Sequence, residues 1–188
     1  MNILAFNGSP RRDGNGAALI TAVLAEARTH GHRAEIVHLY GKRITGCLAC
    51  DRRSCDDWTT AATACNSKDD MTAIVGKIIK ADVLIVSTPV YMGQVSGPMK
   101  TFLDRWCVFF DRDFKVRFLP GKRLVTIVTS GAPPASYKNI STYLSTLLAG
   151  FFKLKPAGSI VAGGLKGKRD VMKRAAVIRK ARMIGSRL

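Results

Sequence analysis

The residues best suited to chemistry lie in a polar loop directly after an N-terminal apolar run. Residues 3–6 are apolar, residues 7–16 read Asn-Gly-Ser-Pro-Arg-Arg-Asp-Gly-Asn-Gly, and a helical pattern then begins. Unpaired backbone N–H groups at a helix start and the positive end of the helix dipole make an anion site. Ser9 adds a hydroxyl donor and Arg11 adds charge. This loop predicts a phosphate site, although the same residue types also suit an ordinary turn.

Two widespread nucleotide motifs are absent from this loop. No G-x-x-x-x-G-K-[ST] is present, and no G-x-G-x-x-G follows the first apolar run. Their absence argues against a P-loop ATPase and against a dinucleotide-type first turn.

The elements that must position this loop alternate between strands and helices. Strands are predicted around residues 3–6, 33–39, 83–87, 122–130 and 157–162, and helices around 19–27, 71–79, 97–106, 137–151 and 169–184. Such alternation is typical of an α/β fold with a parallel sheet and helices on both faces. Residues 88–93 are predicted as a loop, because Pro89 cannot donate a hydrogen bond to a strand neighbour.

Three loops rich in glycine, proline and serine follow predicted strands, at residues 8–16, 89–94 and 130–134. Ligands of open parallel sheets bind beyond the carboxyl ends of the strands. One phosphate loop and two loops suited to a flat ring favour a mononucleotide such as FMN. No nucleophile–base set stands out, and His30, His32 and His38 are interpreted as a packed or solvated group. A cofactor that supplies the chemistry itself fits this pattern.

Three motifs together resemble the NADPH-dependent FMN reductases of the flavodoxin-like superfamily, with iron–sulfur flavoproteins as close relatives. They are residues 7–15, Cys47-x-x-Cys50 with the later Cys65-x-x-x-Asp-Asp-Met, and residues 88–100. The resemblance implies a doubly wound five-stranded parallel sheet in the order 2-1-3-4-5. It also implies an enzyme in which hydride passes from NAD(P)H through flavin N5, without a catalytic side chain.

The same resemblance assigns cofactor residues and partners. The FMN phosphate would lie on Ser9, Arg11, Asn15, Gly16 and Ala17, and the isoalloxazine ring on Pro89, Val90, Tyr91, Met92 and Gly93. The acceptor would be a small molecule such as a quinone, free flavin, azo dye or metal ion, and the protein a homodimer or homotetramer. Many relatives carry Thr or Ser where this chain has Gly16, so one phosphate-binding hydroxyl is missing and FMN is expected to bind less tightly or to leave as a substrate.

Five cysteines stand at positions 47, 50, 55, 65 and 107, and four of them lie in a predicted insertion loop of about residues 40–69 within one domain of residues 1–188. An odd number without a secretion signal argues against a disulfide framework. The spacing C-x2-C-x4-C-x9-C leaves open an Fe–S cluster or zinc. Known Fe–S relatives use a tighter spacing, so the default is plain loop cysteines and no metal. Cys107 is interpreted as a small buried hydrophobe.

The chain carries a net charge of +17, and residues 111–188 hold 17 Lys and Arg against 3 Asp and Glu. Such an excess attracts nucleic acid, anionic lipid or acidic proteins. We favour a solvated basic surface, because aromatic residues do not interleave with the charges. A non-catalytic basic binding module remains an alternative, as does an iron–sulfur electron carrier. No apolar run is long enough to cross a bilayer, and no signal peptide is recognisable, so a cytoplasmic location is expected.

Overall fold

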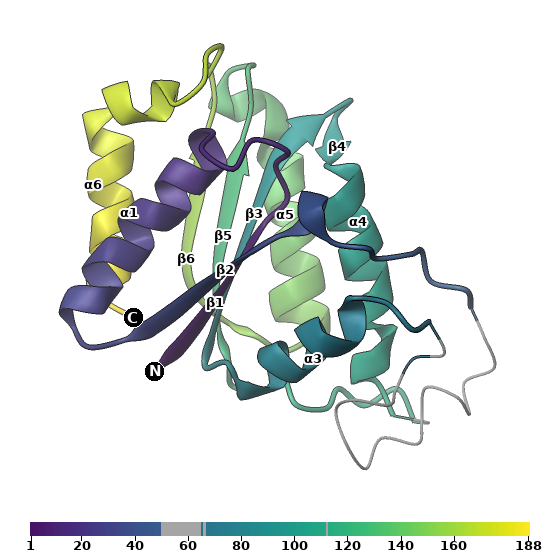
Figure 1. Ribbon diagram of the computed structural model, residues 1–188. Coiled ribbons are helices and arrows are strands. Elements are labelled where there is room, and N and C mark those ends of the chain that lie inside the picture. Colours follow the sequence, from purple (N-terminus) through teal and green to yellow (C-terminus); the bar gives the residue numbers. More distant parts are fainter. Residues whose placement is uncertain (50–64, 66, 112) are drawn as a thin grey trace.

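The fold is described from a computed structural model, in which residues 1–49, 65, 67–111 and 113–188 are described. Five parallel strands form its centre: β1 (Asn2–Asn7), β2 (Arg33–His38), β3 (Val83–Tyr91), β5 (Arg123–Thr129) and β6 (Lys155–Ala162). They lie in the order β2-β1-β3-β5-β6 (Figure 1). Counting only parallel strands, this is the order 2-1-3-4-5, so the flavodoxin-like topology predicted from the sequence is confirmed.

The sheet has a sixth strand that the sequence did not predict. The short strand β4 (Gln94–Val95) pairs antiparallel with the end of β3, so five is not the full strand number.

The prediction of a loop from residue 88 is also wrong, since β3 continues through Pro89, which pairs with Thr129. The carbonyl of Ser87 accepts a hydrogen bond from Gly8 on the β1 side. Two residues further on, the proline nitrogen faces that same side, where pairing with β1 has already ended.

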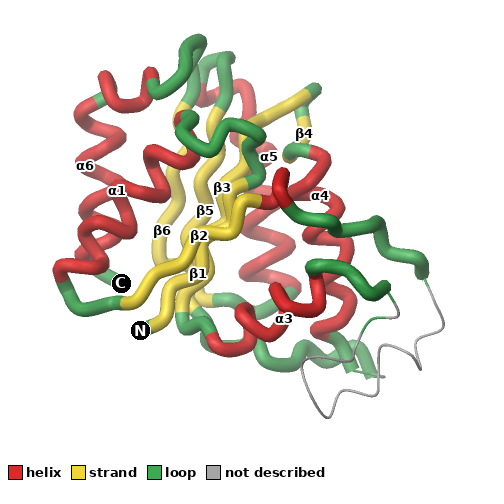
Figure 2. The backbone as a smooth tube through the Cα atoms, viewed as in Figure 1, coloured by secondary structure: helices red, strands yellow, loops and turns green. Residues whose placement is uncertain are grey.

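Helices cover both faces of the sheet (Figures 1 and 2). One face carries α1 (Asn15–Thr29) and α6 (Ala175–Ser186), and the other carries α3 (Met71–Lys80), α4 (Gly97–Asp104) and α5 (Lys138–Ser145). A π-helical segment, Thr146–Phe151, continues α5. Short 3-10 segments span Leu39–Gly41, Arg105–Phe109, Pro134–Tyr137 and Asp170–Lys173.

The last helix differs from its prediction over residues 169–184. A 3-10 turn comes first, and Arg174 has the non-helical angles φ −101° and ψ 76° before α6 begins. The first turn is therefore detached from α6. Its residue Val171 donates its backbone N–H to the side chain of Asn15 at the start of α1. The break places this segment beside the loop that follows β1.

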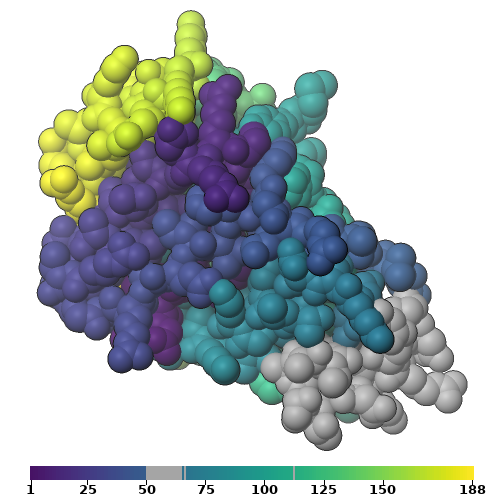
Figure 3. All heavy atoms as spheres, viewed as in Figure 1, coloured from purple at the N-terminus to yellow at the C-terminus, as the bar shows by residue number. Residues whose placement is uncertain are grey.

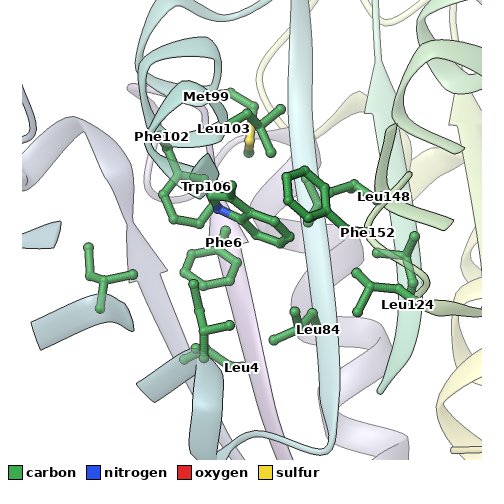
Figure 4. Close-up of a cluster of buried hydrophobic side chains, with 14 of the residues drawn as sticks. Leu4, Phe6, Leu84, Met99, Phe102, Leu103, Trp106, Leu124, Leu148 and Phe152 are labelled. Atoms are coloured by element: carbon green, nitrogen blue, oxygen red, sulfur yellow. The ribbon is translucent and has the colours of Figure 1, made fainter. Parts of the chain in front are cut away.

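Two hydrophobic cores follow from the alternation of side chains along the buried strands. On one side, Ile3 and Ala5 of β1 pack with the apolar face of α1. On the other side, Phe6 packs against Phe102 of α4 at a centroid distance of 4.5 Å, and Phe102 meets Trp106 edge to face at 5.6 Å (Figure 4). Both cores hold the sheet rigid beneath the loops at the carboxyl ends of the strands.

Helices α1 and α6 approach each other closely at Gly185. A Cβ atom at this position would lie 2.3 Å from the carbonyl oxygen of Val23, so only glycine fits. The space-filling view shows the C-terminal residues pressed directly against the N-terminal ones (Figure 3). Among the described residues, no helix combines the length and apolar character needed to span a bilayer.

Candidate functional site

The loop after β1 is held by hydrogen bonds within itself. The fully buried Asn7 accepts a hydrogen bond from the backbone N–H of Ser9 through its Oδ1, at 3.1 Å. Ser9 in turn accepts one from the backbone N–H of Arg11 through its Oγ, at 3.2 Å. These side-chain bonds replace strand pairing and turn the chain sharply toward α1.

Helix α1 starts with its N-terminal donors available. Gly14 is the N-cap residue, no side chain caps the helix, and the first turn contains no acidic residue. The N–H groups of such a first turn lack helical partners and face the positive end of the dipole. With Arg11 beside them, these donors are the candidate anion site.

The side chain of Asn15 is engaged with a distant segment. Its Nδ2 donates to the carbonyl of Gly167 at 3.0 Å, and its Oδ1 accepts from the N–H of Val171 at 3.0 Å. In this structure Asn15 therefore joins the N-terminus of α1 to the segment after β6. The sequence predicted Asn15 as a phosphate donor and did not foresee this contact, which bridges more than 150 residues.

The second loop is a tight hairpin turn at the end of β3. Met92 and Gly93 both have positive φ, 48° and 74°, as a two-residue turn between antiparallel strands requires. Ser96 fixes this turn to the first loop, because its buried Oγ donates to the carbonyl of Gly8 at 2.6 Å and its N–H donates to Oγ1 of Thr88 at 3.0 Å. The two loops therefore form one connected structure.

A hollow at the carboxyl ends of the strands brings the three predicted loops together. It is lined by Ser9, Arg11, Gly14, Asn15, Gly16, Pro89, Val90, Tyr91, Thr129, Ser130, Gly131 and Leu165. Seven of the ten cofactor residues predicted from the sequence line this hollow, while Ala17, Met92 and Gly93 do not. Ala17 is buried in α1, and Met92 is fully exposed at the tip of the hairpin.

The sequence reasoning missed Thr129 and Leu165 as lining residues. The third loop packs tightly on the chain after β6: Leu165 donates its N–H to Ser130 at 3.0 Å, and Gly164 donates to Ala132 at 2.7 Å. A Cβ on Gly163 would lie 2.4 Å from the carbonyl oxygen of Ala132. In the sequence, the signal for this close approach is the pair Gly163 and Gly164 directly after β6.

Larger hollows lie elsewhere, and one of about 330 Å³ sits at the opposite edge of the sheet, lined in part by Asn2, Arg33 and Lys77. This edge holds the amino ends of the parallel strands. Parallel α/β sheets bind ligands at the carboxyl ends, and the helix N-terminus with its free donors lies there as well. The smaller hollow at the three loops is therefore the candidate site.

His38 lies next to the first loop and contacts Asn7, whose Nδ2 is 3.1 Å from the histidine Nδ1. Burial, and secondly the positive charge of Arg12, lower the pKa of His38. The neutral ring accepts from Asn7, which leaves the Asn7 Oδ1 oriented toward Ser9. His38 thus supports the first loop and is not among the residues that line the hollow.

A buried ion pair anchors the cysteine-bearing segment. Arg105, whose side chain is 0% exposed, donates from Nη1 to Oδ2 of Asp69 at 2.6 Å and to the carbonyl of Thr45 at 2.9 Å. It also donates from Nη2 to Sγ of Cys65 at 3.1 Å. Burial alone would raise the Asp69 pKa, but the hydrogen bonds from Arg105 and the N–H groups of Thr45 and Met71 lower it to about 2. Arg105 therefore fixes both ends of this segment.

Cys107 packs against the hydrophobic core as interpreted, but it is only half-buried. Its Sγ also lies 3.7 Å from Sγ of Cys47, so it is a thiol neighbour of the cysteine segment. Cys50 and Cys55 lie outside the described residues. Within the described ranges, no group of three or more His, Cys, Asp or Glu side chains is arranged to hold a metal ion.

The fold defines a flavodoxin-like α/β protein, and its first loop is the candidate anion site. Residues 1–163 match the family model described as NADPH-dependent FMN reductase, and the chain belongs to that family. The resemblance expected from the motifs is therefore confirmed.

Curated relatives include two iron–sulfur flavoproteins from Archaeoglobus fulgidus. One is 33% identical over 131 residues, which cover 70% of this chain and 60% of the relative. The other is 28% identical over 193 residues, covering 100% of this chain and 79% of the relative. A putative NAD(P)H-dependent FMN-containing oxidoreductase, YwqN of Bacillus subtilis, is 33% identical over 107 residues, covering 56% of this chain and 52% of that protein. The chain thus spans under two thirds of the first of these relatives.

Solved structures share the fold at low sequence identity. An NAD(P)H:quinone oxidoreductase from Methanothermobacter marburgensis superposes with a TM-score of 0.74 at 18% identity, over 99% of this chain and 98% of that one. An FMN-dependent NADH-azoreductase from Bacillus anthracis, in complex with FMN, gives 0.73 at 14% identity, over 100% and 99%. At such identities the likeness concerns the fold alone.

Proposed function

We propose that this chain binds FMN at the three-loop hollow and acts as an FMN-dependent NAD(P)H oxidoreductase, with a small-molecule acceptor such as a quinone or free flavin. The observation that carries the proposal is the meeting of an uncapped helix N-terminus with the apolar end of β3 in one hollow. Bound FMN supplies the hydride and electron transfer between the nicotinamide and the acceptor. The protein then has to bind, orient and shield the ring.

The first loop fits a phosphate group. Gly14 and Gly16 let the loop pack closely on its own neighbours, because a Cβ on Gly14 would lie 2.9 Å from Cβ of Arg11 and one on Gly16 would lie 2.8 Å from Oγ of Ser87. In this proposal Ser9, Arg11, Asn15, Gly16 and Ala17 hold the phosphate. Asn15 contributes by fixing the first turn against the segment 167–171, and Ala17 contributes only its backbone.

The second loop fits a flat ring. Pro89, Val90 and Tyr91 present the end of β3 to the hollow, with Tyr91 43% exposed. Met92 and Gly93 continue this surface at the hairpin tip, where the Met92 side chain is fully exposed. We propose that a second copy of the chain covers this tip in a homodimer or homotetramer.

An anaerobic ultraviolet–visible spectrum with FMN and then NADPH or NADH tests the proposal. Flavin bands that bleach on addition of the nicotinamide support it. Absence of FMN uptake and of nicotinamide oxidation contradicts it. Arg11→Ala and Asn15→Ala are each expected to weaken FMN binding at least tenfold. Arg28→Ala, at the opposite end of α1, is the matched control and is expected to bind FMN like the parent chain.

An iron–sulfur electron carrier is the second candidate. The names of the Archaeoglobus relatives and the 3.7 Å approach of Cys47 to Cys107 favour it. Iron and sulfide analysis of anaerobically purified protein separates the two candidates. A basic binding module without flavin would instead show salt-dependent DNA binding and no FMN uptake.

A further inference from the structure

The first loop carries one acidic residue, Asp13, directly before Gly14, the N-cap residue of α1. A carboxylate next to a helix N-terminus is attracted by the positive end of the dipole and accepts hydrogen bonds from the free N–H groups there. Asp13 does not act in this way, since no side chain caps α1. The N-terminal donors of α1 therefore stay available, although a competing anion is the next residue in the chain.

An ion pair holds the Asp13 carboxylate away from these donors. Its Oδ2 lies 2.7 Å from Nζ of Lys168, in the segment after β6. The hydrogen bond from Lys168 is the first cause that lowers the pKa of Asp13 below its usual value, so the carboxylate is ionised at neutral pH. Asp13 lines a groove between α1 and α6 and is not among the residues that line the three-loop hollow.

The segment that carries Lys168 is fixed to the start of α1 on both sides of the lysine. Asn15 donates from Nδ2 to the carbonyl of Gly167 at 3.0 Å and accepts through Oδ1 from the N–H of Val171 at 3.0 Å. These bonds place the lysine backbone beside the loop that bears Asp13. The pair thus depends on the fold, although both side chains are more than half exposed, at 57% for the lysine and 59% for the aspartate.

We propose that Lys168 is a positioning residue for the anion site, which pairs with Asp13 and keeps this carboxylate from competing with a phosphate for the N-terminus of α1. Without the lysine, rotation about the side-chain bonds of Asp13 brings the carboxylate toward the helix donors, where it repels an approaching dianion. Lys168 does not have to contact the ligand for this effect. The inference rests on the proposed function, in which the phosphate belongs to FMN.

Removal and rescue of the pair test this role. Lys168→Met is expected to weaken FMN binding about three- to tenfold at low ionic strength, and by less at high salt, because the charges are exposed. Riboflavin, which lacks the phosphate, is expected to bind the variant and the parent equally. Adding Asp13→Asn to Lys168→Met removes the competing carboxylate and is expected to restore the FMN affinity of the parent. A lysine that touched the phosphate itself, or only stabilised the fold, would not be rescued in this way.

Lys77→Met is the matched control. Lys77 is 47% exposed, pairs with Glu35 and lines the hollow at the opposite edge of the sheet. The control therefore loses the same unit of charge and the same kind of exposed ion pair, away from the first loop. It is expected to bind FMN like the parent. Equal weakening in the two lysine variants would assign the effect to net charge and overturn the proposal.

Flavin titrations of the parent, the two lysine variants and the double variant decide the matter. Weaker FMN binding in Lys168→Met that is restored in the double variant supports the assignment. Unchanged FMN affinity in Lys168→Met, or a weakening that Asp13→Asn does not restore, overturns it. If the parent takes up no FMN, the proposed function fails, and melting curves with inorganic phosphate test the pair separately. Less stabilisation of Lys168→Met than of the parent and the double variant supports the pair, and equal shifts in all three overturn it.

Discussion

Replacing Asp69 with asparagine removes the partner of a fully buried guanidinium. Arg105 has 0% exposure, and the Asp69 side chain has 8%. Removing one member of a buried pair leaves an uncompensated charge, which typically costs about 3–5 kcal/mol. We therefore expect Asp69→Asn to lower the free energy of unfolding by that amount at pH 7, and to loosen the segment that carries Thr45 and Cys65.

The pH dependence follows from the Asp69 pKa, which falls from 3.8 to about 2 in the folded protein. Because the folded value is the lower one, the carboxylate stabilises the fold above the unfolded pKa and loses this effect as the pH falls through the folded pKa. The shift in the Asp69 pKa contributes about 2.5 kcal/mol to the free energy of unfolding at pH 7 and roughly half of that at pH 3. Asparagine does not titrate, so the gap in unfolding free energy between the parent and Asp69→Asn should narrow by about 1 kcal/mol from pH 7 to pH 3.

Urea unfolding followed by tryptophan fluorescence, at several pH values from 7 to 3, measures this gap. Asp104→Asn is the control, because its ion pair with Lys100 is exposed, at 44% and 53% for the two side chains. Such surface pairs contribute about 1 kcal/mol or less. A loss below about 1 kcal/mol for Asp69→Asn at pH 7, or a gap that stays constant down to pH 3, would refute the reasoning.

Three further predictions concern packing, the first loop and the thiols. Gly185→Ala should cost about 1–3 kcal/mol in a melting experiment, since its Cβ would meet the carbonyl of Val23; an unchanged melting temperature contradicts the close approach. Burial lowers the pKa of His38, so stability should fall as the pH drops below 6.5, and His38→Gln should flatten this profile. Diamide should oxidise Cys47 and Cys107 as a pair, so a digest analysed by mass spectrometry should contain the disulfide-linked Cys47 and Cys107 peptides; their absence contradicts the pairing.

Much of the fold was predictable because it depends on local patterns. The continuous apolar run of β3 and the helical spacing in α1 identified the elements, and their alternation required a parallel sheet. Local patterns fail where strand pairing overrides local preference. Pro89 predicts a loop, but its nitrogen faces an edge that β1 no longer occupies, so the strand continues and β4 can pair with its end.

The candidate site was predictable in its loops and less so in its contacts. The residue types of residues 7–16 and 89–94 predict where the loops lie, because turns and helix starts depend on neighbours in the chain; the anion and the ring at these loops stay proposals. The structure alone decided that Asn15 binds the segment 167–171 and that Cys107 lies beside Cys47. It also decided that Ser87 lies beneath Gly16. These pairs are 60 or more residues apart, and only the packing of the helices on the sheet determines which side chains meet.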